Sequence, residues 1–98
     1  MKTARLPNQR RRLSQRGVLT PAQLRAARAL IGWSREDLSK HSGVGANTTK
    51  DFEINNSDPK LGTVQKWRRA LEAAGVKFID ADDQDGPGVR LRAGKGKR

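Results

Sequence analysis

Asn47, Lys50 and Asp51 carry three different hydrogen-bonding groups within one short segment, SREDLSKHSGVGANTTKDFE, which runs from position 34 to position 53. A carboxamide can form a bidentate pair with adenine, an ammonium group can reach guanine or a phosphate, and a carboxylate can accept a hydrogen bond from cytosine. On an ordinary exposed helix the same side chains would contact only water. The interpretation therefore depends on the elements that carry them.

Two capping signals mark the starts of the first two expected helices. T-P-A-Q at 20–23 combines a capping threonine, a proline at the first helical position and a glutamine that can reach back to the cap. S-R-E-D at 34–37 repeats the capping box. We expect the first helix to end near Gly32 and the second near His41, because Gly43 permits the left-handed conformation of a sharp turn.

Apolar spacing predicts two further helices. A third helix is expected over 46–54, with Thr49 and Phe52 among its inward positions. A fourth amphipathic stripe covers 64–74, with Trp67 as a core anchor.

Beyond the fourth helix the apolar period changes to two. V-K-F-I-D and G-V-R-L-R flank a loop rich in Asp, Gly and Pro, which predicts a short antiparallel hairpin over 76–92. The expected fold is therefore mainly α, with four helices and a C-terminal β-hairpin. We expect a folded domain over 18–92, preceded by a basic disordered arm at 1–17 and followed by a basic flexible tail at 93–98.

Positive charge is concentrated at the two ends of the chain. The 98 residues have a net charge of +11, yet residues 17–92 contain 12 basic and 10 acidic groups. The arm contains an arginine triplet, Arg10, Arg11 and Arg12. Such ends predict a polyanionic partner, most often nucleic acid, whereas a solvated tail without a partner is the alternative.

Several classes of site are excluded or disfavoured by the residue types. The chain has no cysteine, and D-D-Q-D at 82–85 lacks the spacing of a calcium loop, so we expect neither a metal nor a cofactor. His41, the one histidine, has no paired carboxylates in a motif around it, so an enzyme is not expected. RNA binding is disfavoured because no aromatic stacking platform is recognisable. Without a membrane-length apolar run or a secretory signal, we expect a cytoplasmic protein.

The second and third expected helices, joined by the turn at Gly43, form a helix-turn-helix motif over 34–54. A structural helical hairpin without a ligand would explain the same packing positions. Residues 19–92, including R-A-L-I-G-W-S, S-G-V and G-V-K-F-I-D, resemble the Cro/lambda-repressor-type (XRE-type) transcriptional regulators, in particular short bacterial members with a C-terminal hairpin. The resemblance implies a lambda-repressor-like domain, a recognition helix in the major groove, and a homodimer that binds double-stranded DNA at an inverted repeat.

The resemblance also assigns DNA contacts to individual residues. Arg35 matches a position that contacts a phosphate or a base edge, and Thr48 matches a frequent phosphate contact. The exposed start and outer face of the recognition helix are matched by Ala46, Asn47, Lys50 and Asp51. For each of these residues the alternative is an exposed helix position without a DNA contact.

Two features depart from the family pattern. Thr49 stands where the family usually has Ile or Val, and its hydroxyl can bond to a carbonyl four residues earlier. Gly45 and Ala46 are small residues at the N-terminal end of the recognition helix, where they can make few base contacts. DNA shape can therefore supply part of the specificity.

The expected function is that of a sequence-specific, dimeric DNA-binding transcriptional regulator, whose arm adds phosphate or minor-groove contacts. Phe78, Ile79 and Leu91, on apolar faces expected to be exposed, are the candidate dimer interface. One alternative is an antitoxin-like protein that binds a protein partner through its basic tails. Another is an excision or recombination accessory factor, which would bind clustered direct repeats and bend DNA.

Overall fold

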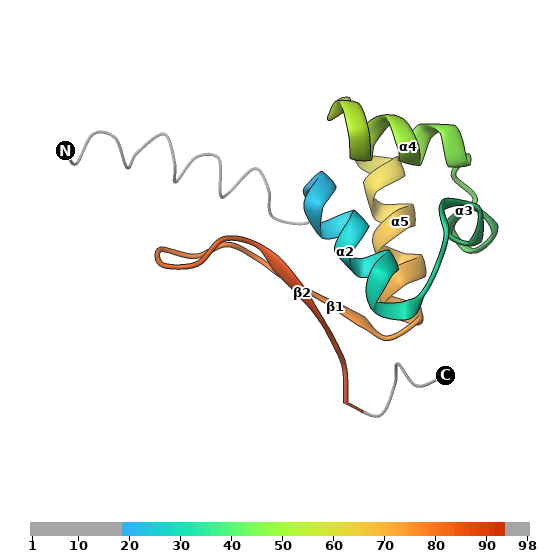
Figure 1. Cartoon of the computed structure of the whole chain (residues 1–98). Helices are drawn as coiled ribbons and strands as arrows, with labels where there is room; N and C mark the ends of the chain where they lie inside the picture. Colours follow the sequence, from blue (N-terminus) through green and yellow to red (C-terminus); the bar gives the residue numbers. More distant parts are fainter. Residues whose placement is uncertain (1–18, 94–98) are drawn as a thin grey trace.

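The computed structural model describes residues 19–93, which form four helices followed by a two-stranded antiparallel sheet (Figure 1). The elements in chain order are α2 (Pro21–Ile31), α3 (Arg35–Ser42), α4 (Ala46–Asn55), α5 (Leu61–Ala73), β1 (Val76–Ile79) and β2 (Gly88–Leu91). The predicted mainly α fold with a C-terminal hairpin is confirmed. The arm at 1–17, with Arg10, Arg11 and Arg12, and the tail beyond Ala93 lie outside the described residues.

Both predicted capping boxes are present. At the start of α2, the backbone N–H of Gln23 donates to Thr20 Oγ1 at 3.1 Å, and the backbone N–H of Thr20 donates to Gln23 Oε1 at 2.9 Å. At the start of α3, Asp37 and Ser34 make the same pair of bonds at 3.0 and 2.9 Å. The backbone hydrogen bond from Ser34, and then the one with its side chain, lower the pKa of Asp37 because they stabilise the charged carboxylate.

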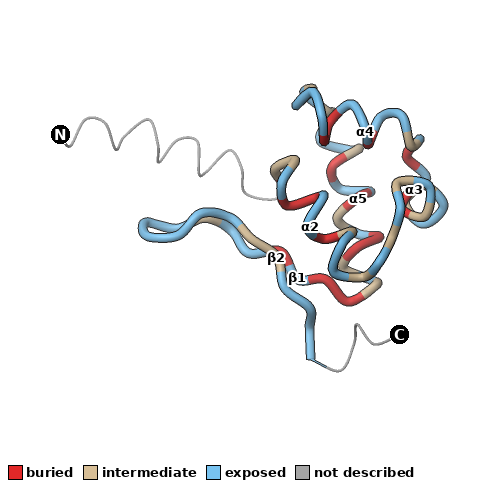
Figure 2. Tube along the Cα trace, in the orientation of Figure 1, coloured by how far each residue is buried: buried red, intermediate tan, exposed pale blue. Residues whose placement is uncertain are grey.

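The core lies where the helices meet the base of the hairpin. Different elements contribute completely buried side chains: for example, Leu24 of α2, Leu38 of α3, Trp67 of α5 and Val76 of β1 are each 0% exposed. Trp67 also stacks on Phe52 of α4, with ring centroids 5.1 Å apart. Figure 2 shows that buried positions line the inner sides of the helices and the base of the hairpin, while the hairpin loop is almost entirely exposed.

The hairpin packs one face against the helices. Val76 pairs with Leu91, and Phe78 pairs with Val89. Residues opposite one another in a sheet share a face, so these four side chains lie on the inner face and Ile79 lies on the outer face. The expectation of an exposed Phe78 is wrong, because Phe78 is only 8% exposed and belongs to the core.

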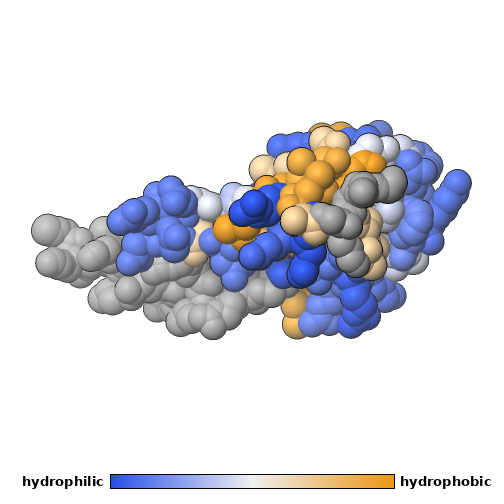
Figure 3. All heavy atoms as spheres, turned by 90° about the horizontal axis from the view of Figure 1, so that it is seen from below, coloured by the Kyte–Doolittle hydropathy of each residue, from blue (hydrophilic) through white to orange (hydrophobic). Residues whose placement is uncertain are grey.

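Two polar side chains attach the hairpin to the helices. Gln23 Nε2 donates to the carbonyl oxygens of Ile79 and Gly88, at 3.3 and 3.0 Å, so the capping-box partner of Thr20 also binds both strands. The Arg68 guanidinium lies 4.9 Å from the ring centroid of Phe78. From below, hydrophobic residues gather over the helical part of the molecule and the protruding hairpin loop is hydrophilic (Figure 3).

Candidate functional site

The predicted helix-turn-helix segment over 34–54 consists of α3, a tight turn and α4. Gly43 ends α3 with a φ of 80°, a left-handed conformation that glycine adopts without strain. Val44 follows and is only 8% exposed, so its side chain fills the turn. α4 ends at Asn55, one residue later than expected, because Asn56 takes the left-handed position with a φ of 54°.

The outer face of α4 brings together the side chains that the sequence marks as DNA contacts. Five exposed polar residues line a shallow hollow of about 470 Å³ on this face: Asn47, Thr48, Lys50, Asp51 and Asn55. Ala46, at the start of the helix, is half-buried. Sequence reasoning did not single out Asn55, although its i,i+4 spacing from Asp51 is a usable signal. Its Nδ2 donates to Asp51 Oδ1 at 2.8 Å and thereby orients that carboxylate.

The inner face of α4 is fixed to α5 by a buried hydrogen bond. Trp67 Nε1 donates to Thr49 Oγ1 at 3.0 Å, and both residues are 0% exposed. The Thr49 hydroxyl also makes a long bond of 3.5 Å to the carbonyl of Gly45, as predicted. The indole donor needs an acceptor once it is buried, so threonine is explained here and Ile or Val would leave that donor without one.

The same face of α4 is fixed to α2 and α3 through Glu53, whose side chain is completely buried. Arg28 of α2 binds the carboxylate with two bonds of 2.8 Å, from Nε to Oε2 and from Nη2 to Oε1. Arg28 Nη1 also donates to the carbonyl of Trp33 at 3.0 Å. Arg25, one turn earlier in α2, donates to the backbone carbonyl of Glu53 at 2.6 Å.

Arg35 joins this network as well as standing at the predicted DNA-contact position. Its Nε donates to Glu53 Oε1 at 3.0 Å, and its side chain is 32% exposed. Two sequence features are consistent with this network: Arg25 and Arg28 interrupt an apolar helix face, and Glu53 directly follows Phe52, an expected inward position.

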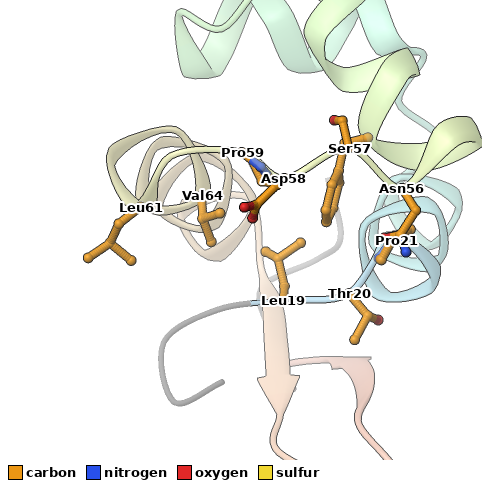
Figure 4. Close-up of a pocket in the computed structure, with 10 residues that line it drawn as sticks. Leu19, Thr20, Pro21, Asn56, Ser57, Asp58, Pro59, Leu61 and Val64 are labelled. Carbon is orange, nitrogen blue, oxygen red and sulfur yellow. The ribbon is translucent and has the colours of Figure 1, made fainter. Parts of the chain in front are cut away.

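A larger groove lies away from the outer face of α4. It has a volume of about 690 Å³ and is bounded by the start of α2, the end of α4 and the start of α5 (Figure 4). Leu19, Phe52 and Val64 supply apolar walls, and Asp58 is the one ionisable side chain that the described part of the chain contributes to it. Among residues 19–93, none of the predicted DNA contacts lines this groove.

His41 stacks on Trp33, with ring centroids 4.2 Å apart and planes 16° from parallel. Its Nδ1 lies 2.9 Å from the carbonyl oxygen of Asp37. Within residues 19–93, no group of three or more His, Cys, Asp or Glu side chains is arranged to hold a metal ion. In the same part of the chain, no helix is both long enough and apolar enough to cross a bilayer.

The fold and the outer face of α4 define a small helix-turn-helix domain with a polar, exposed second motif helix. No protein-family model matches the chain. Over 40 residues the chain is 45% identical to Antitoxin HigA1 of Mycobacterium tuberculosis, in the strains CDC 1551 / Oshkosh and ATCC 25618 / H37Rv. The similarity covers 41% of this chain and 27% of each relative, so it spans about a quarter of the proteins it matches.

Proposed function

We propose that this chain is a sequence-specific DNA-binding transcriptional regulator of the lambda-repressor-like (XRE) type, acting in the cytoplasm without catalytic activity. The outer face of α4 carries the proposal, because Asn47, Lys50 and Asp51 are exposed side by side on a helix whose inner face is held by buried polar contacts. These groups match the donors and acceptors that base pairs present in the major groove. α4 lies on the outside of the domain, where it can enter a groove about 12 Å wide (Figure 1).

The charge distribution supports the same proposal. A net charge of +11 suits a polyanion, and phosphate contacts supply most of the affinity of non-specific DNA binding. Arg35 and Thr48 are the proposed phosphate contacts of the motif. The arginines at 10–12 are proposed to add contacts that do not depend on sequence.

A homodimer on an inverted repeat is the proposed assembly, with half-sites about 34 Å apart. Ile79 and Leu91, which are 39% and 36% exposed, remain candidate interface residues. They lie on opposite faces of the hairpin, so a partner that covers both must approach a free edge of the two-stranded sheet. Phe78 supports this hairpin from the core and is not proposed as a contact.

The partial similarity to an antitoxin favours a second candidate function, in which the chain neutralises a protein partner and DNA binding is secondary. Its test is co-expression with the product of the neighbouring gene. An antitoxin would relieve growth inhibition by that product, also when Asn47 and Lys50 are replaced by alanine.

The leading proposal is tested by selecting bound sequences from random duplex DNA and footprinting the enriched site. We expect a symmetric site that binds two chains, which sedimentation of the complex would measure. Asn47→Ala should reduce discrimination between the selected site and random DNA by about 1–3 kcal/mol with an unchanged salt dependence, because it removes a base contact and no charge. Gln65→Ala is the matched control, since Gln65 is an exposed carboxamide on α5. Equal weakening of both DNAs by Asn47→Ala, or no weakening, would show that residue 47 does not read sequence.

A further inference from the structure

The Glu53 cluster contains more positive than negative charge. One buried carboxylate faces two guanidinium groups, those of Arg28 and Arg35. Arg28 satisfies the carboxylate by itself, since it binds both oxygens and uses its third nitrogen on the carbonyl of Trp33. Arg35 is therefore a second cation on a carboxylate whose two oxygens Arg28 already binds.

Arg35 is bound at one nitrogen only. Its Nε donates to Glu53 Oε1, whereas Nη1 and Nη2 make no hydrogen bond to any residue in the described part of the chain. A guanidinium is planar and rigid, so a bond at Nε restrains where the two remaining nitrogens can point. The group is partly exposed and keeps a donor fork, which is the geometry that binds a phosphate oxygen pair.

We infer that Glu53 is a positioning residue: it holds Arg35 by Nε and presents the Nη1/Nη2 fork to a phosphate of the DNA backbone. This phosphate would lie beside the major groove that α4 is proposed to enter. The inference rests on the proposed function and adds a role for a residue that DNA itself does not touch. Glu53 belongs to α4, so one buried carboxylate orients both the reading helix and the phosphate anchor. If Glu53 only neutralised Arg28, its loss would affect the placement of α4 but not the orientation of the Arg35 guanidinium.

The test compares four proteins in binding to a random-sequence duplex and to the duplex selected by the wild type: wild type, Arg35→Ala, Glu53→Gln and the double variant. Arg35→Ala should weaken binding to both duplexes by about 10-fold to 100-fold, the range for a hydrogen bond to a charged group. It should also flatten the salt slope by about 0.9, the change for one lost phosphate contact. Arg69→Ala is the control, since it removes an exposed arginine of α5.

The double variant separates positioning from structure. If Glu53 acts through Arg35, Glu53→Gln should weaken binding in the wild-type background and change it less than twofold in the Arg35→Ala background. Equal weakening in both backgrounds would assign Glu53 a structural role and overturn the inference. Duplexes with one phosphate replaced by a neutral methylphosphonate supply a second readout: at least one replacement should weaken the wild type and have no effect on Arg35→Ala or Glu53→Gln, and the absence of any such position would overturn the inference.

Glu53→Gln removes a buried charge, so circular dichroism must first establish that the variant is folded. If Glu53→Gln is not folded, Arg35→Lys supplies the test instead. Lysine keeps the charge but has no Nε for Glu53 to hold, so we expect Arg35→Lys to bind DNA as weakly as Arg35→Ala. Lysine binding as tightly as arginine would overturn the inference. A wild-type chain that binds no DNA would overturn the proposed function itself. Wild-type binding that Arg35→Ala matches would overturn the roles of Arg35 and Glu53 but leave the proposed DNA binding standing.

Discussion

Replacing Thr49 with valine should destabilise the domain, although valine is almost the same size and more hydrophobic. Thr49 and Trp67 are both 0% exposed, and the indole N–H of Trp67 donates to Thr49 Oγ1 at 3.0 Å. Valine offers no acceptor. A buried donor would therefore lose the hydrogen bond that the structure gives it, in a place where water does not reach.

Two opposing free energies set the size of the effect. A buried donor without a partner costs about 1–3 kcal/mol, whereas exchanging the hydroxyl for a methyl group recovers up to about 0.8 kcal/mol of hydrophobic free energy. The net loss of unfolding free energy should be about 1 kcal/mol and at most about 2 kcal/mol. For a domain of this size that corresponds to a fall in Tm of about 4–16 °C.

Thermal and urea unfolding followed by circular dichroism would measure this loss. Thr49→Ser is the matched control: it keeps the acceptor and loses one methyl group, at a cost of about 0.5–1.5 kcal/mol by analogy with other single-methyl deletions. In a Trp67→Phe background no indole donor remains, so Thr49→Val should then cost little or stabilise. An unchanged Tm for Thr49→Val, or the same loss with phenylalanine at position 67, would refute the explanation of why a threonine stands there.

Two further predictions concern charge. Deletion of residues 2–16 removes six cations, so it should weaken binding to selected and random DNA alike. The salt slope should flatten by about 0.9 per lost phosphate contact, and the helical content should be retained. If the deletion instead reduced discrimination between the two DNAs, the arm would read sequence. The pKa of Asp37 is lower in the folded than in the unfolded chain, so its capping contribution is complete above the unfolded-state pKa and is lost as the pH falls through the folded-state pKa. An NMR titration should place the Asp37 midpoint below the ordinary aspartate range in the wild type, and Ser34→Ala should move it only part of the way back, because alanine loses the side-chain bond but keeps the backbone bond. An ordinary midpoint in the wild type would contradict the prediction.

Local sequence signals predicted most of the fold. The capping boxes at Thr20 and Ser34 involve residues three positions apart, so their geometry follows from the helix itself. Gly32 and Gly43 were expected to end helices, and both adopt a positive φ. The alternation of residue types likewise predicted the hairpin, because a strand side chain can face only one of two sides.

Which face of the hairpin packs against the helices could not be predicted from the sequence. Phe78 and Ile79 are adjacent and both apolar, so either could have faced the core. The choice depends on the pairing of Val76 with Leu91 and on the bonds from Gln23 to both strands. Gln23 lies 56 and 65 positions from its two carbonyl partners, and no local pattern reports a contact of that length.

The same limit explains why the inner face of α4 was only partly predicted. Its one buried apolar side chain is Phe52; the other two buried residues are Thr49 and Glu53. Apolar burial is not directional, so Phe52 alone would allow the helix to rotate or slide on the core. The bonds from Trp67 to Thr49 and from Arg28 to Glu53 are directional, and they come from α5 on one side and α2 on the other. A helix that must present its outer face to a ligand in one orientation gains more from two such bonds than from the same area of apolar contact. The polar residues of the inner face are therefore best understood as fixing the rotation of α4, and with it the direction in which its outer side chains point.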